Sequence, residues 1–165
     1  MKHRVLLALA PAAAAVAIAG CGGGSGAPSP AAAPTSRSGA SGSGATVTLT
    51  HSKLGSYLSD GKGRSLYLFE ADKSTKSTCS SACASIWPPL TASGAVKPGT
   101  GVSAPLLSTT KRTDGSTEIT YNGHPLYYYV GDDRPGRTTG QGLNQFGAKW
   151  YLVAANGNKF DRNGS

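Results

Sequence analysis

One six-residue pattern, tyrosine-x-aromatic-x-x-aspartate, occurs twice in the chain. The first copy covers residues 67–72 and the second covers residues 127–132, so corresponding positions differ by 60. In each copy a leucine comes directly before the tyrosine, and a glycine comes three residues before that leucine. A tryptophan follows each copy, Trp87 in the first and Trp150 in the second. Repetition at a fixed offset is the signature of a duplicated structural unit, so we expect two equivalent halves.

The pattern around both copies is that of short β-strands separated by turns. Val47 and Leu49 alternate with threonines, which is typical of a half-buried strand. Asn122-Gly123 lies between two strand-like runs, and both residues tolerate the positive φ of a tight hairpin turn. We therefore predict two three-stranded antiparallel meanders and a closing strand over residues 149–154. The predicted strands of the meanders are 47–49, 54–58 and 65–70 in the first unit, and 106–111, 117–121 and 125–130 in the second.

The predicted fold is mainly β: a small antiparallel sandwich or barrel-like domain with at most one or two short helical turns. The helical candidate is residues 80–87, because Cys79, Cys83 and Trp87 share one helix face and two prolines follow. We expect Trp87 to plug one end of the core.

The six motif residues are predicted to be structural. Side chains alternate along a strand, so Leu66 and Leu68 face one side, and Tyr67 and Phe69 face the other. The second copy repeats this, with Leu126, Tyr128 and Val130 opposite Tyr127 and Tyr129. Strands with large residues on both faces are usually covered on both. The aspartates Asp72 and Asp132 are expected to accept hydrogen bonds from turn amides or from a tyrosine hydroxyl.

The N-terminus predicts export and lipid attachment. Residues 1–20 have the basic start and short apolar run of a signal peptide, and Ile18-Ala19-Gly20-Cys21 is a bacterial lipobox. Diacylglycerol on Cys21 would anchor the chain on the extracytoplasmic side of the cell membrane. An ordinary secretory signal with an incidental Cys21 is the alternative. Residues 21–45 form a predicted flexible linker rich in Gly, Ser, Ala and Pro. Residues 46–155 form the predicted domain, and residues 156–165 a predicted disordered tail.

Two cysteines, Cys79 and Cys83, remain after Cys21 is assigned to the lipid. In an oxidising compartment we expect them to form a disulfide that fixes the local geometry of the Trp87 segment. A redox-active dithiol is the alternative, although it would favour Cys-x-x-Cys spacing in a thioredoxin-like context.

Taken together, these features resemble one protein family. Besides the lipobox and the two tyrosine-aspartate motifs, the chain contains two further stretches. One is Cys79-x-x-x-Cys83-x-x-x-Trp87-Pro-Pro-Leu, and the other is Asp114-Gly115 followed by Tyr121-Asn-Gly-x-Pro-Leu-Tyr. The chain is similar over residues 53–153 to the bacterial lipoproteins described as a secreted repeat of unknown function. This resemblance implies secretion, lipid attachment and a duplicated unit. It carries over no catalytic or binding residue.

The residues show no constellation typical of an enzyme, a metal centre or a cofactor site. Neither His51 nor His124 has metal-ligand spacing, no serine lies in Gly-x-Ser-x-Gly, and the glycine-rich residues 136–142 lack a phosphate-loop ending. We therefore expect a protein without catalytic residues, metal or cofactor. A hydrolase whose site assembles from distant residues is the least favoured alternative.

The function expected from the sequence is a non-catalytic binding or structural module of the cell envelope. The net charge is +8, or +6 once the signal peptide is removed, which favours contact with an anionic envelope polymer or glycan. The basic residues are scattered singly, so a solvated basic surface is the alternative. We expect no nucleic acid partner. An envelope redox or electron-transfer accessory is the rival class. The candidate binding surface consists of Tyr121, His124, Tyr128, Arg134 and Arg137. The opposing interpretation is that the tyrosines of this surface belong to the core and that its arginines are merely solvated.

Overall fold

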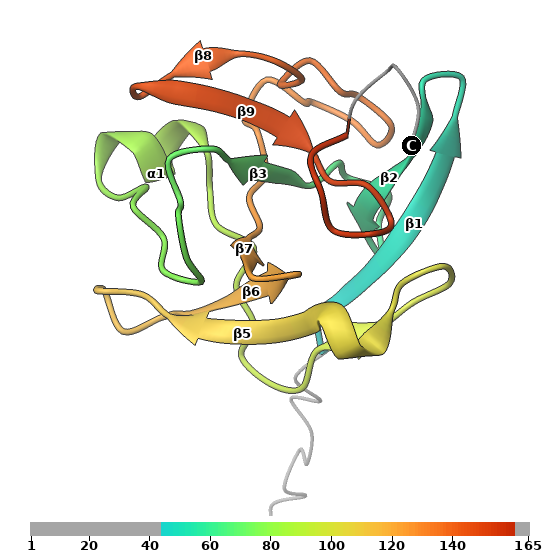
Figure 1. The fold of residues 1–165 in the computed structure, drawn as a ribbon, viewed down its shortest axis with the longest axis horizontal. Helices are drawn as coiled ribbons and strands as arrows, with labels where there is room; N and C mark the ends of the chain where they lie inside the picture. Colours follow the sequence, from blue (N-terminus) through green and yellow to red (C-terminus); the bar gives the residue numbers. More distant parts are fainter. Residues whose placement is uncertain (1–43, 161–165) are drawn as a thin grey trace, which may run out of the picture. The chain divides into compact units, whose positions relative to one another are not determined.

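The computed structural model describes residues 44–160 of the 165-residue chain, and these residues are mainly β, as predicted. Three sheets of three strands have the orders β2-β1-β4, β3-β9-β8 and β5-β6-β7 (Figure 1). All pairings between these strands are antiparallel except that of β1 with β4, and the described sheets do not close into a barrel. The elements in chain order are β1 (Thr46–Ser52), β2 (Gly55–Asp60), β3 (Tyr67–Phe69), α1 (Ala82–Ile86), β4 (Lys97–Pro98), the 3-10 turn η1 (Ala104–Leu106), β5 (Leu107–Lys111), β6 (Thr117–Tyr121), β7 (His124–Pro125), β8 (Asn144–Gln145) and β9 (Ala148–Leu152).

Each copy of the repeat contains the predicted meander. β1 pairs with β2 and β5 pairs with β6 in matching registers, and the third segment of each copy then folds back onto the second. The Leu66 amide donates to the Leu58 carbonyl, and the Leu126 amide donates to the Ile119 carbonyl. The turn before β7 is built by Asn122, whose φ is 49°, and by Gly123, whose φ is 80°. A left-handed conformation at both positions is what the Asn-Gly pair predicts.

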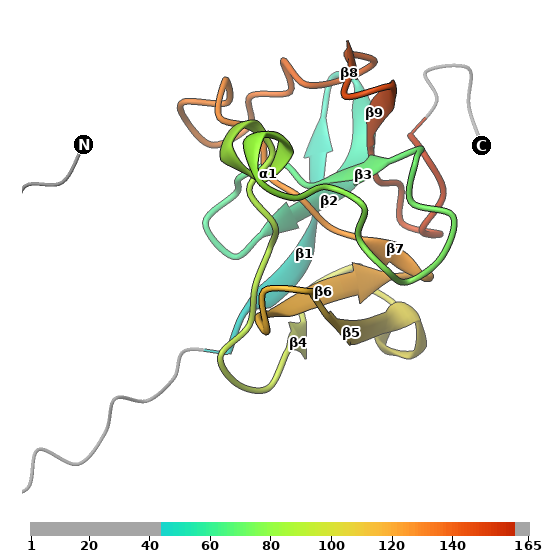
Figure 2. The same ribbon diagram turned by 90° about the vertical axis from the view of Figure 1, so that its left-hand side faces the viewer.

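The two copies meet at the motif tyrosines. Tyr67 and Tyr127 exchange two backbone hydrogen bonds of 2.9 Å, each amide donating to the other's carbonyl. Figures 1 and 2 show β3 and β7 in the middle of the fold, between β9 and β6. The exchange relates the copies by an approximate two-fold axis that passes between the two tyrosines.

The strand partners are swapped between the copies. β3, from the first copy, pairs with β9, which follows the second motif, so that Tyr67 lies opposite Leu152. Tyr127, in turn, lies opposite Pro89, which follows the first motif. Each motif strand is therefore completed by a segment that belongs to the other copy. The two copies thus interlock at their motif strands.

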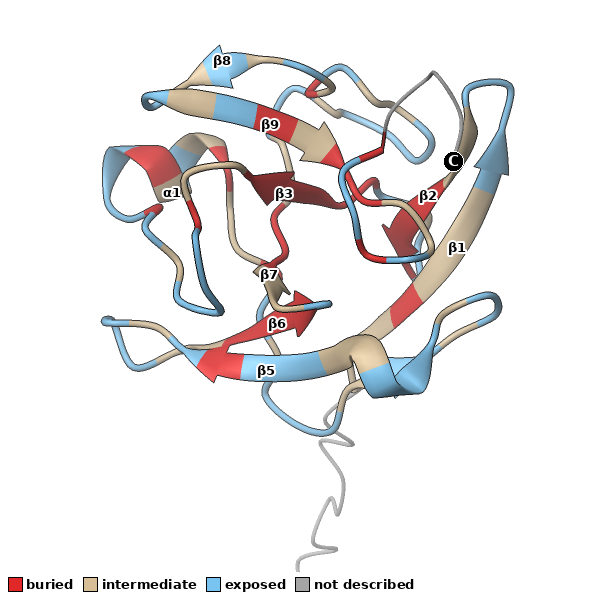
Figure 3. Cartoon of the chain, viewed as in Figure 1, coloured by how far each residue is buried: buried red, intermediate tan, exposed pale blue. Residues whose placement is uncertain are grey.

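The core divides into an aromatic cluster and a mostly aliphatic cluster. Figure 3 shows β3, the first motif strand, buried along its length. Tyr67 and Phe69 belong to the aromatic cluster, whereas Leu66 and Leu68 belong to the aliphatic one, as the alternation predicts. The prediction fails at Val130, which is 54% exposed because the chain turns away from the core after Tyr129. Trp87 is fully buried at the end of α1, as expected.

The packed domain extends beyond the predicted boundary at residue 155. Phe160 is buried and its ring lies edge-on to Tyr57, with 6.4 Å between ring centroids. The Phe160 amide also donates to the Leu152 carbonyl at 2.7 Å. The prediction that residues 156–165 are a disordered tail is therefore wrong for residues 156–160, because one aromatic ring anchors them to the core. The rest of that segment, the signal peptide, Cys21 and nearly all of the linker lie outside the described residues.

Candidate functional site

The motif tyrosines and aspartates hydrogen-bond across the two copies. The Tyr67 hydroxyl donates to Asp132 Oδ2 at 2.5 Å, and the Tyr127 hydroxyl donates to Asp72 Oδ2 at 2.6 Å. Burial, followed by the neighbouring carboxylates, raises the pKa of both tyrosines far above the ordinary value of 10.0. Both hydroxyls are thus held as neutral donors to the aspartate of the opposite copy.

Each aspartate is also fixed by a threonine of its own copy. Asp72 Oδ1 accepts from the amide and the hydroxyl of Thr78 at 2.7 and 2.6 Å. Asp132 Oδ1 accepts from the amide and the hydroxyl of Thr139 at 2.8 and 2.6 Å. Because both carboxylate oxygens of each aspartate already have protein partners, the repeated motif is a structural clamp.

Four rings of the aromatic cluster, two from each copy, form one continuous stack. The sequence along the stack is Phe69, Trp150, Trp87 and Tyr129, with successive centroid distances of 4.0, 4.0 and 4.4 Å. Gly140 lies against this stack, and a methyl group there would come within 2.8 Å of Trp87. The stack is a packing unit that leaves no room for a side chain at residue 140.

A buried ion pair that the sequence analysis missed lies behind the first motif. Arg112 Nη1 is 2.7 Å from Glu118 Oε2, and the Glu118 side chain is fully buried. Burial raises the pKa of Glu118 to about 7 even though Arg112 opposes this rise. Glu118 Oε1 has no hydrogen-bond partner in the described structure. A glutamate in the middle of a strand covered on both faces was the available sequence signal.

Arg112 ties this ion pair to the cysteine loop. Its guanidinium donates to Ser77 Oγ at 2.7 Å and to the Cys79 carbonyl at 2.5 Å. The predicted disulfide between Cys79 and Cys83 is present. The segment that leads to Trp87 is thus held both by the disulfide and by Arg112.

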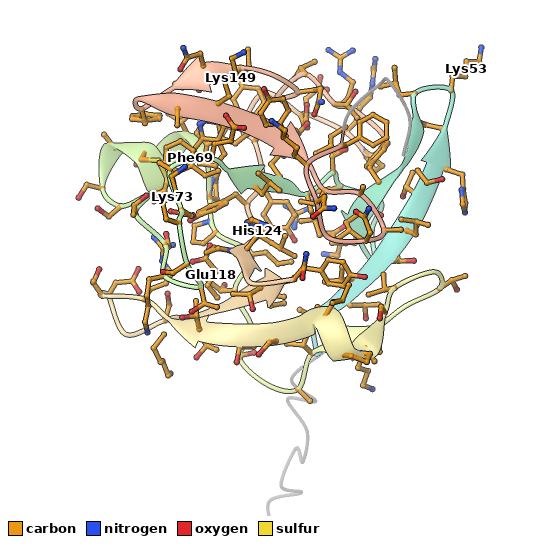
Figure 4. All side chains as sticks on the ribbon, in the orientation of Figure 1. Lys53, Phe69, Lys73, Glu118, His124 and Lys149 are labelled. Carbon is orange, nitrogen blue, oxygen red and sulfur yellow. A yellow bond between two sulfur atoms is a disulfide. The ribbon has the colours of Figure 1, made fainter. Side chains whose placement is uncertain are left out.

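A groove of about 860 Å³ opens beside the first motif. It lies between the residues after β3, the turn before β7 and the C-terminal segment. Figure 4 labels three of its lining residues, Phe69, Lys73 and His124, which lie in the view between β9 above and β5 below. The full lining is Leu68, Phe69, Glu70, Asp72, Lys73, Ser74, Thr75, Asn122, Gly123, His124, Asn158 and Lys159.

The equivalent region of the other half is closed. There, Tyr128 stands at the position that corresponds to Leu68, and its hydroxyl donates to Asp60 at 3.0 Å. The Arg64 guanidinium lies 3.8 Å from the centre of the Tyr128 ring, and Arg64 corresponds to His124. A backbone hydrogen bond of 3.0 Å from Gly136 to Gly63 joins the loop to the turn. The groove is therefore the open counterpart of a filled site.

Different residues at equivalent positions explain this difference. Ser65 closes its half by donating its hydroxyl to the Arg137 carbonyl, whereas the corresponding residue in the open half is Pro125, which has no donor. Ser77, in the corresponding loop of the open half, is bound instead by Arg112. The loop after Asp72 thus has its anchor on Arg112, and no backbone hydrogen bond joins it to the Asn122-Gly123 turn in the described part of the chain.

The five residues predicted to form a binding surface do not form one. Tyr121 is fully buried, and its hydroxyl donates to the Ala155 carbonyl and accepts from the Ser103 amide. Tyr128 belongs to the closed half, where Arg134 and Arg137 also lie on the loop that closes it. His124 alone lines the groove, so the predicted surface is wrong: strand alternation and the swapped pairing send its members to different faces.

The described residues contain no cluster of three or more His, Cys, Asp or Glu side chains able to hold a metal ion. In the same residues, no helix has the length and apolarity needed to span a membrane.

The fold and the clamp define a duplicated, mainly β protein whose copies complete each other. Residues 48–91 and 108–154 each match the family described as a secreted repeat of unknown function. The matches cover more than half of the chain, so the chain belongs to this family, as its resemblance implied. The description of the family indicates an extracytoplasmic location. No curated protein and no solved structure matches the chain.

Proposed function

We propose that this protein is a lipid-anchored, non-catalytic binding module of the cell envelope, and that the open groove is its binding site. The observation that carries the proposal is the asymmetry between the halves. A duplicated unit with a purely structural role has no need of one open and one filled site, yet about 860 Å³ is left open in one half, which is within the range of about 300–1,000 Å³ typical of ligand sites.

The motif itself supports a non-catalytic role. Asp72 lines the groove, but its carboxylate is bound by Thr78 and by the Tyr127 hydroxyl. These three hydrogen bonds occupy both oxygens of the carboxylate, so the carboxylate is held in place by the fold. The groove therefore presents surfaces for recognition, and the ligand class expected is an envelope glycan or anionic polymer.

The anchoring part of the proposal is tested by intact mass. The protein extracted from membranes should lack residues 1–20 and carry a diacylglycerol on Cys21. Cys21→Ser should release the chain from the membrane fraction, whereas Cys83→Ser, which changes a cysteine of the folded domain, should not. An unmodified Cys21, or a Cys21→Ser chain that still fractionates with membranes, would contradict the anchor.

The binding part is tested by sedimentation of the purified full chain with insoluble envelope polymers. Retention in the pellet, saturable with protein concentration, supports a binding module. A chain that stays in the supernatant with every envelope polymer would sink this part of the proposal.

The redox accessory is a second candidate, favoured by the four-ring stack next to the Cys79–Cys83 disulfide. Equilibration with thiol redox buffers separates the two functions. A structural disulfide should stay oxidised at glutathione potentials, whereas an electron-transfer role requires one that cycles there.

A further inference from the structure

We infer that the groove binds a neutral oligosaccharide rather than an anionic polymer. This inference rests on the proposed binding function and specifies its ligand. It follows from the way in which the groove uses up its own charges, from the polar groups that it leaves available, and from its apolar floor.

The charged residues of the groove neutralise one another. Lys159 Nζ lies 3.1 Å from Glu70 Oε1, and Lys73 Nζ donates to the Glu70 carbonyl at 2.7 Å. Asp72 is fully hydrogen-bonded within the clamp. The lining holds two acidic and two basic side chains, so its formal charge is zero with His124 neutral. A polyanion would find no excess of positive charge there.

The polar groups that remain are neutral and can both donate and accept hydrogen bonds. The side-chain amides of Asn122 and Asn158 and the imidazole of His124 line the groove and have no hydrogen-bond partner among the described residues. Burial lowers the pKa of His124 below 6.5, with Asp72 opposing this effect, so its ring is neutral at pH 7. A sugar hydroxyl is likewise both donor and acceptor, and it matches amides and a neutral imidazole.

The floor of the groove is the apolar end of β3. Leu68 and Phe69 both line the groove there, although they belong to different core clusters and each is only 3% exposed. The Phe69 ring is held in place by its stack on Trp150, with 4.0 Å between ring centroids. An apolar floor with a rim of neutral polar groups suits a pyranose, which has C–H faces and equatorial hydroxyls. The closed half lacks both features, because Tyr128 and Arg64 fill the corresponding space.

The test is calorimetric titration of the full chain, purified in detergent, with neutral oligosaccharides of glucose, mannose and N-acetylglucosamine and, separately, with polyglycerol phosphate. At least one neutral oligosaccharide should bind. His124→Ala and Asn158→Ala should each weaken that binding about tenfold, since each removes one hydrogen bond. Arg64→Ala, the counterpart of His124→Ala in the closed half, should leave the affinity unchanged. Leu68→Tyr, which copies the residue that fills the other half, should abolish binding, and circular dichroism would show whether this variant folds.

The outcomes separate this inference from the proposed function. Neutral oligosaccharide binding that is equally strong in His124→Ala and Asn158→Ala would overturn the groove as the site. Binding of polyglycerol phosphate alone would overturn the ligand class and leave the binding module intact. Failure of every soluble glycan, together with saturable sedimentation on envelope polymers, would also refute only the neutral ligand. Failure in both assays would refute the binding function itself.

Discussion

The hydroxyl of Tyr67 donates to Asp132 at 2.5 Å, so the tyrosine of the first motif is paired with the aspartate of the second. Tyr127 and Asp72 repeat this bond in the opposite direction at 2.6 Å. The six-residue pattern is therefore completed only when two copies meet. A single copy would leave the buried tyrosine hydroxyl without its acceptor and one carboxylate oxygen of the aspartate without its tyrosine donor, which is costly.

The cross-pairing predicts a specific energetic coupling. Tyr67→Phe and Asp132→Asn should each lower the free energy of unfolding by about 1–3 kcal/mol, because each removes one side of a buried hydrogen bond. In a double-mutant cycle measured by urea denaturation, the two changes should couple by at least about 0.5 kcal/mol. The control is Tyr67→Phe combined with Thr78→Val, because Thr78 binds Asp72, the partner of Tyr127. The effects of these two changes on the free energy of unfolding should be nearly additive. Strong coupling in the control and none in the cross pair would disprove the clamp.

The motif is also predicted to be a fold determinant. Tyr67→Ala and Tyr127→Ala should each cost about 3–5 kcal/mol, as for a large buried aromatic residue, because both side chains are fully buried. Denaturant melts of the full chain measure this cost. Stable Tyr→Ala variants that had lost ligand binding would make the repeated motif the functional site instead.

The duplication, and the face of the strand to which each motif side chain points, could be predicted from the sequence because both follow from periodicity. The fixed offset predicts equivalent halves, and strand alternation separates Leu66 from Tyr67. The swapped pairing could not be predicted in the same way. Equivalent positions have equivalent patterns, so the sequence does not distinguish whether β3 pairs with the return segment of its own copy or with that of the other.

The groove was beyond sequence reasoning for a related reason. It depends on differences between the halves, such as Leu68 against Tyr128 and Pro125 against Ser65, which matter only once the halves are superimposed in space. The sequence pattern favours tyrosines and arginines as a binding surface, whereas Tyr128, Arg134 and Arg137 lie in the closed half. Asn158 lies in the segment that the sequence predicts to be a disordered tail, so no sequence signal places it in the groove.

Reduction of the disulfide should loosen the Trp87 segment without unfolding the domain. The cysteines are four residues apart, and so short a loop contributes at most about 2 kcal/mol through chain entropy. Arg112 still holds the Cys79 carbonyl after reduction. Hydrogen exchange should become faster in residues 79–87 and stay unchanged in β1 and β2, with the Cys79→Ser/Cys83→Ser chain insensitive to reductant. Loss of protection throughout the domain would show a larger role for the disulfide.

The C-terminal anchor can be tested at one aromatic residue. Phe160→Ala should lower the free energy of unfolding by about 3 kcal/mol, since it empties a buried site against Tyr57. Phe146→Ala removes the same side chain from a position that is 47% exposed, so it should change stability by no more than about 0.5 kcal/mol. Equal effects in urea melts would mean that Phe160 contributes nothing to the core.

The buried Glu118 makes stability depend on pH in a defined window. Its pKa is raised from 4.5 to about 7, chiefly by burial, so the folded state holds a proton that the unfolded state has already released. This contribution is fully present below pH 4.5 and is lost as the pH rises to about 7. The loss is on the order of 3 kcal/mol. Glu118→Gln stays neutral at all pH values and retains a side-chain acceptor for Arg112. Because the variant has no such titration, its unfolding free energy should rise relative to that of the parent chain as the pH increases from 4.5 to 7. His124 titrates in both proteins and cancels in that difference. Urea denaturation at half-unit pH steps measures the difference directly, and a constant value across this window would mean that Glu118 is ionised throughout and paired with Arg112 without a net cost.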